Sequence, residues 1–252
     1  MLWSSLAICP PNKSYRADYR SYPVIYSVEI PKQIFNFITN NMTHKTIKLL
    51  ALFIVIFSSS FAQEFEGEVI YENSYKSKIP NVTDEQLTTM LGNRQEFFIK
   101  GGNYKSTSNG TVLEWQLYVN QDNKLYNKMS NSPALLWNDA ALNTDEVIKA
   151  EINKGVLKIL GYSCDELILT CKSGVEKYYF SSKIKIDPAA YEKHKFGHWS
   201  DVTAKSHSLP IKMIIANQQF SLESVATEIK PMKLANDLFQ LPADSKLEKS
   251  PY

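Results

Sequence analysis

The sequence contains little cysteine and little glycine, with 3 and 9 residues in a chain of 252. Three thiols cannot form the dense disulfide framework of a small secreted scaffold, nor can they supply four cysteine ligands to a zinc ion. No glycine-rich segment matches a phosphate-binding loop, and no serine lies in a Gly-x-Ser-x-Gly nucleophile elbow. We therefore expect a protein without enzymatic activity, catalytic residues or a cofactor.

An excess of one charge sign is also absent, because 28 Lys and Arg residues face 26 Asp and Glu residues. A nucleic-acid-binding protein needs a clustered basic surface, so we expect no nucleic-acid partner. The hydrophobic share of 44% and the charged share of 21% are typical of a globular domain and exclude a disordered chain or a coiled coil.

Long hydrophobic runs are missing as well. The nine-residue apolar run Leu49–Phe57 is too short to span a bilayer, which takes about 20 residues, although a buried core helix is an alternative. The run follows the basic residues Lys45 and Lys48 and precedes Ser60-Phe61-Ala62, as in a signal peptide cleaved before Gln63. This pattern predicts a signal peptide at residues 42–62 and export to the periplasm or the extracellular space. No cysteine follows the cleavage site, so we expect neither a lipid anchor nor a transmembrane segment in the mature chain.

Residues 1–41 precede the signal peptide and show no clear periodicity. We expect translation to begin at Met42 and residues 1–41 to be an upstream extension from a misplaced start codon, with a genuine long leader as the alternative. Residues 63–252 then form a single secreted β-rich domain.

Alternation of apolar and polar residues dominates this domain and predicts strands. The cleanest example places Leu113, Trp115, Leu117 and Val119 on one face of a strand that follows the hairpin signal Asn109-Gly110. Roughly eleven short strands joined by hairpin turns predict a mostly β (α+β) fold. We expect a curved antiparallel sheet or half-barrel with two or three short helices.

Helix signals are few. Thr83 and Gln86 form a capping box before a short helix to about Leu91, and Asp187-Pro188 predicts a second helix start. A loop or short helix is expected at residues 132–145. Two strands, at residues 147–152 and 156–162, are expected to flank a turn.

The histidines of the mature chain, His194, His198 and His207, gather near Asp201. A helix over residues 194–198 would place two imidazoles on one face, as zinc sites require. Gly197 and the neighbouring lysines disfavour that arrangement. We favour a solvated loop over a metal site formed by His194, His198 and His207, and over a metal-dependent hydrolase.

The two thiols of the mature chain, Cys164 and Cys171, are seven residues apart. One continuous strand would hold them roughly 23 Å apart and on opposite faces, whereas a disulfide needs Cα atoms about 4.4–6.8 Å apart. We predict one strand and two unpaired thiols.

Four segments occur in a recognisable order: Gly161–Cys164, Tyr178–Pro188, Ser208–Lys212 and Phe239–Pro242. In this order the sequence resembles uncharacterised secreted proteins of Bacteroidota, including the GLPGLI family and related domains of unknown function. Several such families resemble the lipoprotein-carrier superfamily, a half-open antiparallel barrel with helices on its concave face. The Gly-Leu-Pro-Gly-Leu-Ile motif itself is absent, and Ser208–Lys212 takes the comparable place. The resemblance implies an apolar cavity for an acyl chain or another hydrophobic ligand, and no catalytic residues.

Two functions follow as hypotheses. The first is a non-enzymatic extracytoplasmic protein that binds or carries a lipid or another hydrophobic ligand in a half-barrel groove, whose wall is Leu113, Trp115, Leu117 and Val119. The second is an assembly module that binds other envelope proteins along exposed strand edges.

Overall fold

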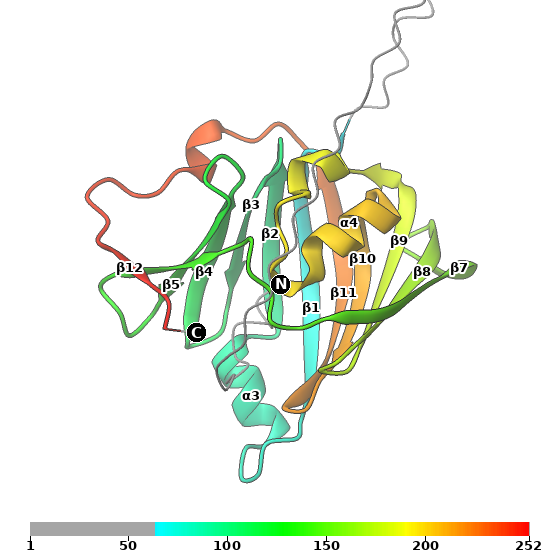
Figure 1. Cartoon of the computed structure of the whole chain (residues 1–252), viewed down its shortest axis with the longest axis horizontal. Helices are drawn as coiled ribbons and strands as arrows, with labels where there is room; N and C mark the ends of the chain where they lie inside the picture. The colour runs from blue at the N-terminus through cyan, green and yellow to red at the C-terminus, as the bar shows by residue number, and fades with distance from the viewer. Residues whose placement is uncertain (1–63, 252) are drawn as a thin grey trace, which may run out of the picture. The chain divides into compact units, whose positions relative to one another are not determined.

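A computed structural model of the chain describes residues 64–251, so the expected upstream extension and signal peptide lie outside the described residues. Twelve strands form one sheet (Figure 1). Their bounds are β1 Gly67–Ser77, β2 Arg94–Lys100, β3 Asn103–Ser108, β4 Leu113–Val119, β5 Lys124–Met129, β6 Leu135–Asp139, β7 Val147–Ile159, β8 Tyr162–Cys171, β9 Val175–Lys185, β10 Ser208–Ala216, β11 Phe220–Pro231 and β12 Leu247–Lys249.

The sheet is curved and open. Its strand order is β12-β6-β5-β4-β3-β2-β1-β11-β10-β9-β8-β7, which leaves β12 and β7 at the two edges. The β12–β6 pair is parallel, and the strand pairs between β6 and β7 in this order are antiparallel. The predicted fold class, a curved and mostly antiparallel sheet with few helices, is confirmed.

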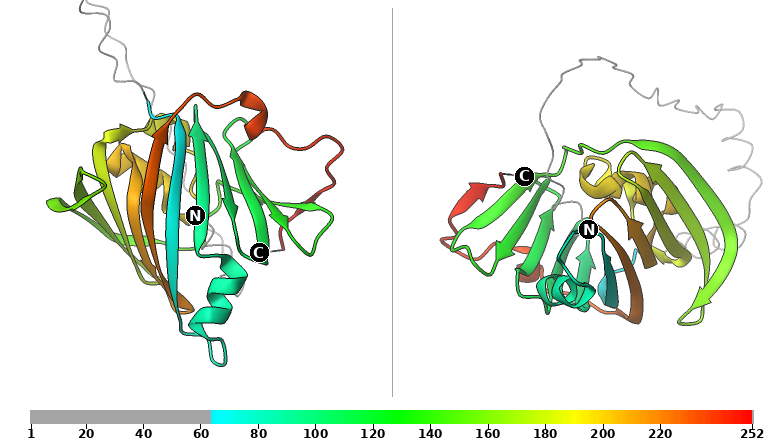
Figure 2. Two further views of the ribbon diagram at one scale, coloured as in Figure 1. Left: turned by 180° about the vertical axis from the view of Figure 1, so that it is seen from behind. Right: turned by 90° about the horizontal axis from the view of Figure 1, so that it is seen from below.

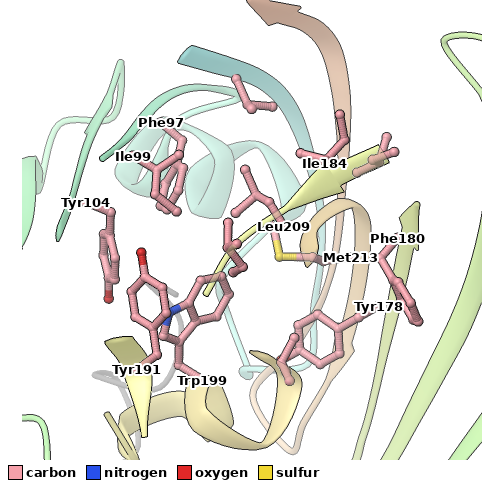
Figure 3. Packing of buried hydrophobic residues seen from close by; sticks show 14 of the residues in the cluster. Phe97, Ile99, Tyr104, Tyr178, Phe180, Ile184, Tyr191, Trp199, Leu209 and Met213 are labelled. Carbon is pink, nitrogen blue, oxygen red and sulfur yellow. The ribbon is translucent and has the colours of Figure 1, made fainter. Parts of the chain in front are cut away.

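Helical segments between β9 and β10 cover the concave face of the sheet (Figure 2). They are the 3-10 helices η2 (Pro188–Tyr191) and η3 (Phe196–His198) and the α-helix α4 (Trp199–Ser206). Tyr191, Trp199 and Val202 point from these segments into the main hydrophobic cluster and are at most 1% exposed. Figure 3 shows Tyr191 and Trp199 beside Tyr104 of β3.

A second helix, α3 (Asp84–Leu91), closes one end of the same face. The predicted capping box is present, since Gln86 N donates to Thr83 Oγ1 and Thr83 N donates to Gln86 Oε1. Leu87 and Leu91 pack in a smaller cluster with residues of β1, β10 and β11. No helix in the described part of the chain is long and apolar enough to cross a membrane.

Two local expectations are wrong. Residues 135–139 form the strand β6, because Leu135 and Trp137 find partners on both β5 and β12. Residues 147–159 form one strand, β7, since the expected turn at Asn153–Gly155 is taken up as a register shift against β8. A bulge absorbs extra residues without ending a strand.

The four residues of the predicted ligand-binding wall do not share a face. The β4–β5 register shifts between Leu113 and Trp115, and an extra residue in a strand reverses the side toward which the following residues point. Leu113 packs in one cluster with Leu87 and Leu91 of α3, whereas Trp115, Leu117 and Val119 pack with Phe239. Phe239 ends the 3-10 helix η4 (Asn236–Phe239), which lies on the opposite side of the sheet from α4.

Candidate functional site

A row of buried, uncharged polar side chains crosses the concave face, one from each of seven neighbouring strands. Each member is at most 6% exposed. We call this set the polar row: Ser224 (β11), Asn73 (β1), Gln95 (β2), Ser106 (β3), Gln116 (β4), Asn127 (β5) and Asn138 (β6).

Strand pairing aligns the row. Asn73 pairs with Ser224, and Gln116 pairs with both Ser106 and Asn127. Because side chains alternate along a strand, each member shares the face of an apolar neighbour two positions away. The row thereby separates the cluster under α4, which contains Tyr71, from the cluster under α3, which contains Tyr75.

Only some members of the row form side-chain hydrogen bonds with one another. Gln116 Nε2 donates to Asn127 Oδ1 over 2.8 Å, and Asn127 Nδ2 donates to Asn138 Oδ1 over 3.0 Å. Among residues 64–251, however, no hydrogen-bond partner lies within reach of Gln116 Oε1, Ser106 Oγ or Ser224 Oγ. A buried polar atom left without a partner costs about 1–3 kcal/mol, so these three atoms mark a place where a further group would be stabilising.

A cavity of about 10 Å³ adjoins the row at Gln95, close to the lower limit for one water molecule. Its other walls are Tyr71, Phe97, Leu209, Pro210 and Met213, of which Phe97, Leu209 and Met213 are drawn in Figure 3. The Tyr71 hydroxyl donates to Pro210 O over 2.6 Å. The apolar walls of this cavity therefore lie directly beside the side-chain amide of Gln95.

The expectation of a solvated histidine loop is wrong for two of the three histidines. His194 is fully buried, its ring centroid lies 4.1 Å from that of Tyr118, and its Nε2 lies 2.8 Å from the Tyr104 hydroxyl. Burial among aromatic rings lowers the pKa of His194 to about 3. His194 is therefore neutral at physiological pH.

His198 is 3% exposed but lies among acidic groups and a thiol. Its Nδ1 is 3.1 Å from Glu176 Oε2 and 3.8 Å from Cys171 Sγ, and its Nε2 is 3.7 Å from Asp145 Oδ2. Burial alone would lower the pKa of His198, but hydrogen bonding to Cys171 and Glu176 outweighs burial and raises this pKa to about 11. We call Asp145, Cys171, Glu176 and His198 the His198 cluster.

The three histidines do not form the metal site that was the alternative to a solvated loop. His207 is exposed at the C-cap of α4, and the Nε2 of His194 is engaged by Tyr104. In the described part of the chain, the His, Cys, Asp and Glu side chains close enough to share a metal ion are Asp145, Cys171 and His198. Their spacing in the sequence gave no signal, because β7 and β8 follow Asp145 before Cys171 is reached, and β9 lies between Cys171 and His198.

Both thiols are free and buried, and β8 runs unbroken from Tyr162 to Cys171, which confirms the predicted strand and the unpaired cysteines. Cys164 and Cys171 nevertheless both belong to the main hydrophobic cluster. In an ideal strand, two residues seven positions apart would lie on opposite faces.

Comparison with known proteins gives no independent assignment, because neither a family model nor a curated protein matches this sequence.

Proposed function

We propose that this chain is a non-enzymatic extracytoplasmic protein that binds a lipid-like ligand on the concave face of its half-barrel, along the polar row. The observation that carries the proposal is the set of buried, unpartnered oxygens on Ser106, Gln116 and Ser224. The predicted signal peptide at residues 42–62 and the resemblance to secreted GLPGLI-like and lipoprotein-carrier-like proteins support the same proposal.

The chemistry of the row refines the ligand. The seven side chains of the row are uncharged, so they match uncharged acceptors and donors, such as the ester or amide groups of an acyl lipid, better than a charged headgroup. Aromatic and aliphatic side chains at Tyr71, Phe97 and Met213 adjoin the row, and they would contact the apolar chain of such a lipid once the cavity of about 10 Å³ between them widened. A purely hydrocarbon ligand would leave the oxygens of the row unpaired, which disfavours it.

Native mass spectrometry of the protein purified from its own envelope tests this function. We expect a bound lipid mass on the wild-type chain. The double variant Ser106→Ala/Ser224→Ala removes two hydrogen bonds worth about 1 kcal/mol each, so its occupancy at limiting lipid should fall about thirtyfold.

Ser206→Ala is the matched control, because this buried hydroxyl already donates to Ser208 O and is not available to a ligand. The control should keep the lipid. A wild-type chain without any bound mass, or equal lipid occupancy in the double variant, would contradict the proposal.

The second candidate function, an envelope assembly module, is favoured by the edge strand β7. This strand is 13 residues long, its one neighbour among the described strands is β8, and Ile148, Ile152 and Val156 are 64%, 42% and 43% exposed. The free edge matches an extended segment of an envelope protein, because such a segment pairs with unpaired backbone groups.

Cross-linking in intact cells tests this candidate. Lys149 and Lys154 lie on the edge strand and should cross-link to one envelope protein. In Ile148→Lys/Ile152→Lys these links should be lost while the lipid occupancy of the polar row is unchanged. Links that persist in this variant would reject the edge as the contact surface.

A further inference from the structure

The His198 cluster lies apart from the polar row and has no role in the proposed lipid binding. One ligand atom from each of Asp145, Cys171 and His198 lies within 4.8 Å of the other two. We propose that these three residues bind a zinc ion.

The donor set fits this metal. A thiolate, an imidazole nitrogen and a carboxylate oxygen are the groups that bind zinc in proteins, at about 2.3, 2.0–2.1 and 2.0–2.2 Å. Two nitrogen or oxygen ligands in a tetrahedral site are then about 3.4 Å apart. His198 Nε2 and Asp145 Oδ2 are 3.7 Å apart, so a small shift of one side chain brings both to bonding distance.

An unpartnered atom points to the same place. His198 is 3% exposed, yet no residue of the described chain forms a hydrogen bond with its Nε2. The other ring nitrogen, Nδ1, faces Glu176 Oε2 at 3.1 Å and Cys171 Sγ at 3.8 Å. Histidine ligands of zinc commonly show this division of roles, with one nitrogen on the metal and the other bonded to a carboxylate.

Neighbouring groups hold both carboxylates of the cluster, Asp145 and Glu176, in position. Ser173 donates to Asp145 from its hydroxyl over 2.6 Å and from its backbone N–H over 3.1 Å. The Tyr178 hydroxyl donates to Glu176 Oε2 over 2.7 Å. The Asp145 side chain is 19% exposed, which gives the ion a route from solvent and leaves the fourth coordination position to water.

The alternative without a metal is an ion pair, in which the charge of a protonated His198 is balanced by Glu176 and Asp145. The ion pair accounts for the carboxylates but leaves a buried Nε2–H without a hydrogen-bond acceptor. In the zinc site, Nε2 and the Cys171 thiolate each donate an electron pair to the metal, and their protons are released to solvent.

Titration of the metal-free, reduced chain with Co²⁺, a spectroscopic substitute for Zn²⁺, tests the site. We expect one equivalent to give a thiolate-to-cobalt charge-transfer band and visible bands of a tetrahedral ion, and one equivalent of Zn²⁺ to remove them. Cys171→Ser should lose the charge-transfer band. The matched control, Cys164→Ser, changes the other buried thiol at the opposite end of β8 and should keep it.

Two further variants keep the proposal falsifiable if Cys171→Ser does not fold. Asp145→Asn removes a partly exposed ligand, and Glu176→Gln weakens the orientation of His198, so each should lower Zn²⁺ affinity about 10–100-fold. Zn²⁺ should raise the Tm of the wild type and of Cys164→Ser. Absence of stoichiometric Co²⁺ binding, or loss of the band in Cys164→Ser alone, would overturn the zinc site.

Discussion

The polar row and the His198 cluster both lie on the helix-covered side of one sheet, but they differ in charge and in pairing. The row is uncharged, and several of its oxygens, those of Ser106, Gln116 and Ser224 among them, have no partner among the described residues. The cluster is ionisable, and its carboxylates are held by Ser173 and Tyr178. Uncharged unpartnered atoms select an uncharged hydrogen-bonding ligand, whereas a thiol, an imidazole and a carboxylate together select a cation.

The largest effect should come from breaking the charged site. Glu176→Ala removes the carboxylate beside the buried His198 and leaves the Tyr178 hydroxyl without its acceptor. We expect a loss of about 3 kcal/mol in the free energy of unfolding of the metal-free protein. Urea denaturation measures this loss, and Glu114→Ala, at an exposed position of β4, should stay within about 0.5 kcal/mol of the wild type.

Acid should distinguish His194 from the cluster. The pKa of His194 falls from 6.5 to about 3 in the folded chain because of burial. The folded state favours neutral His194, so the free energy of unfolding is not reduced by this residue above pH 6.5. It decreases as the pH falls from 6.5 toward 3, because His194 must then be protonated or stay neutral at a cost. Between pH 6.5 and 5 the loss from His194 should be about 2 kcal/mol. Urea midpoints across this range should show a smaller loss for His194→Gln; an equal loss would remove His194 as the cause.

A smaller effect is expected at the aromatic partner of His194. Tyr104→Phe keeps the stacked ring but removes the hydroxyl that lies 2.8 Å from Nε2, which should cost about 1 kcal/mol. Tyr126→Phe is the control, because that hydroxyl contacts the exposed Asp122. Thermal unfolding compares the two, and an unchanged Tm in Tyr104→Phe would contradict the assigned contact.

The smallest effect is expected within the row. Ser224→Ala removes a fully buried hydroxyl that has no hydrogen-bond partner in residues 64–251, so the ligand-free protein should be unchanged or slightly more stable. Ser206→Ala removes a hydroxyl that donates to Ser208 O and accepts from Ser208 N, and it should cost about 1 kcal/mol. Equal losses measured in urea would mean that Ser224 is paired after all.

The sequence predicted those parts of the fold that short patterns encode. The capping box at Thr83 defined the start of α3, and alternation after Asn109-Gly110 defined β4. It did not predict α4, because Gly197 and the β-branched residues Val202 and Thr203 are poor helix formers. Burial of Trp199 and Val202 against the sheet stabilises that helix instead.

Neither candidate site was predictable from short patterns. Each member of the polar row is a single polar residue in its own strand. Strand pairing sets some members directly opposite one another, as in Asn73–Ser224 and Ser106–Gln116–Asn127, whereas Gln95 and Asn138 are offset by two positions along their strands. The His198 cluster likewise combines a loop residue, the end of β8, β9 and the start of α4. The expected wall at Leu113–Val119 failed because one bulge reversed the face of the strand.

A crystal structure of the protein purified from its own envelope would show whether the polar row binds an uncharged hydrogen-bonding ligand. We expect continuous ligand density along the concave face, with polar ligand atoms within hydrogen-bond distance of Ser106 Oγ, Gln116 Oε1 and Ser224 Oγ. Density for ordered water alone at these three oxygens would contradict it.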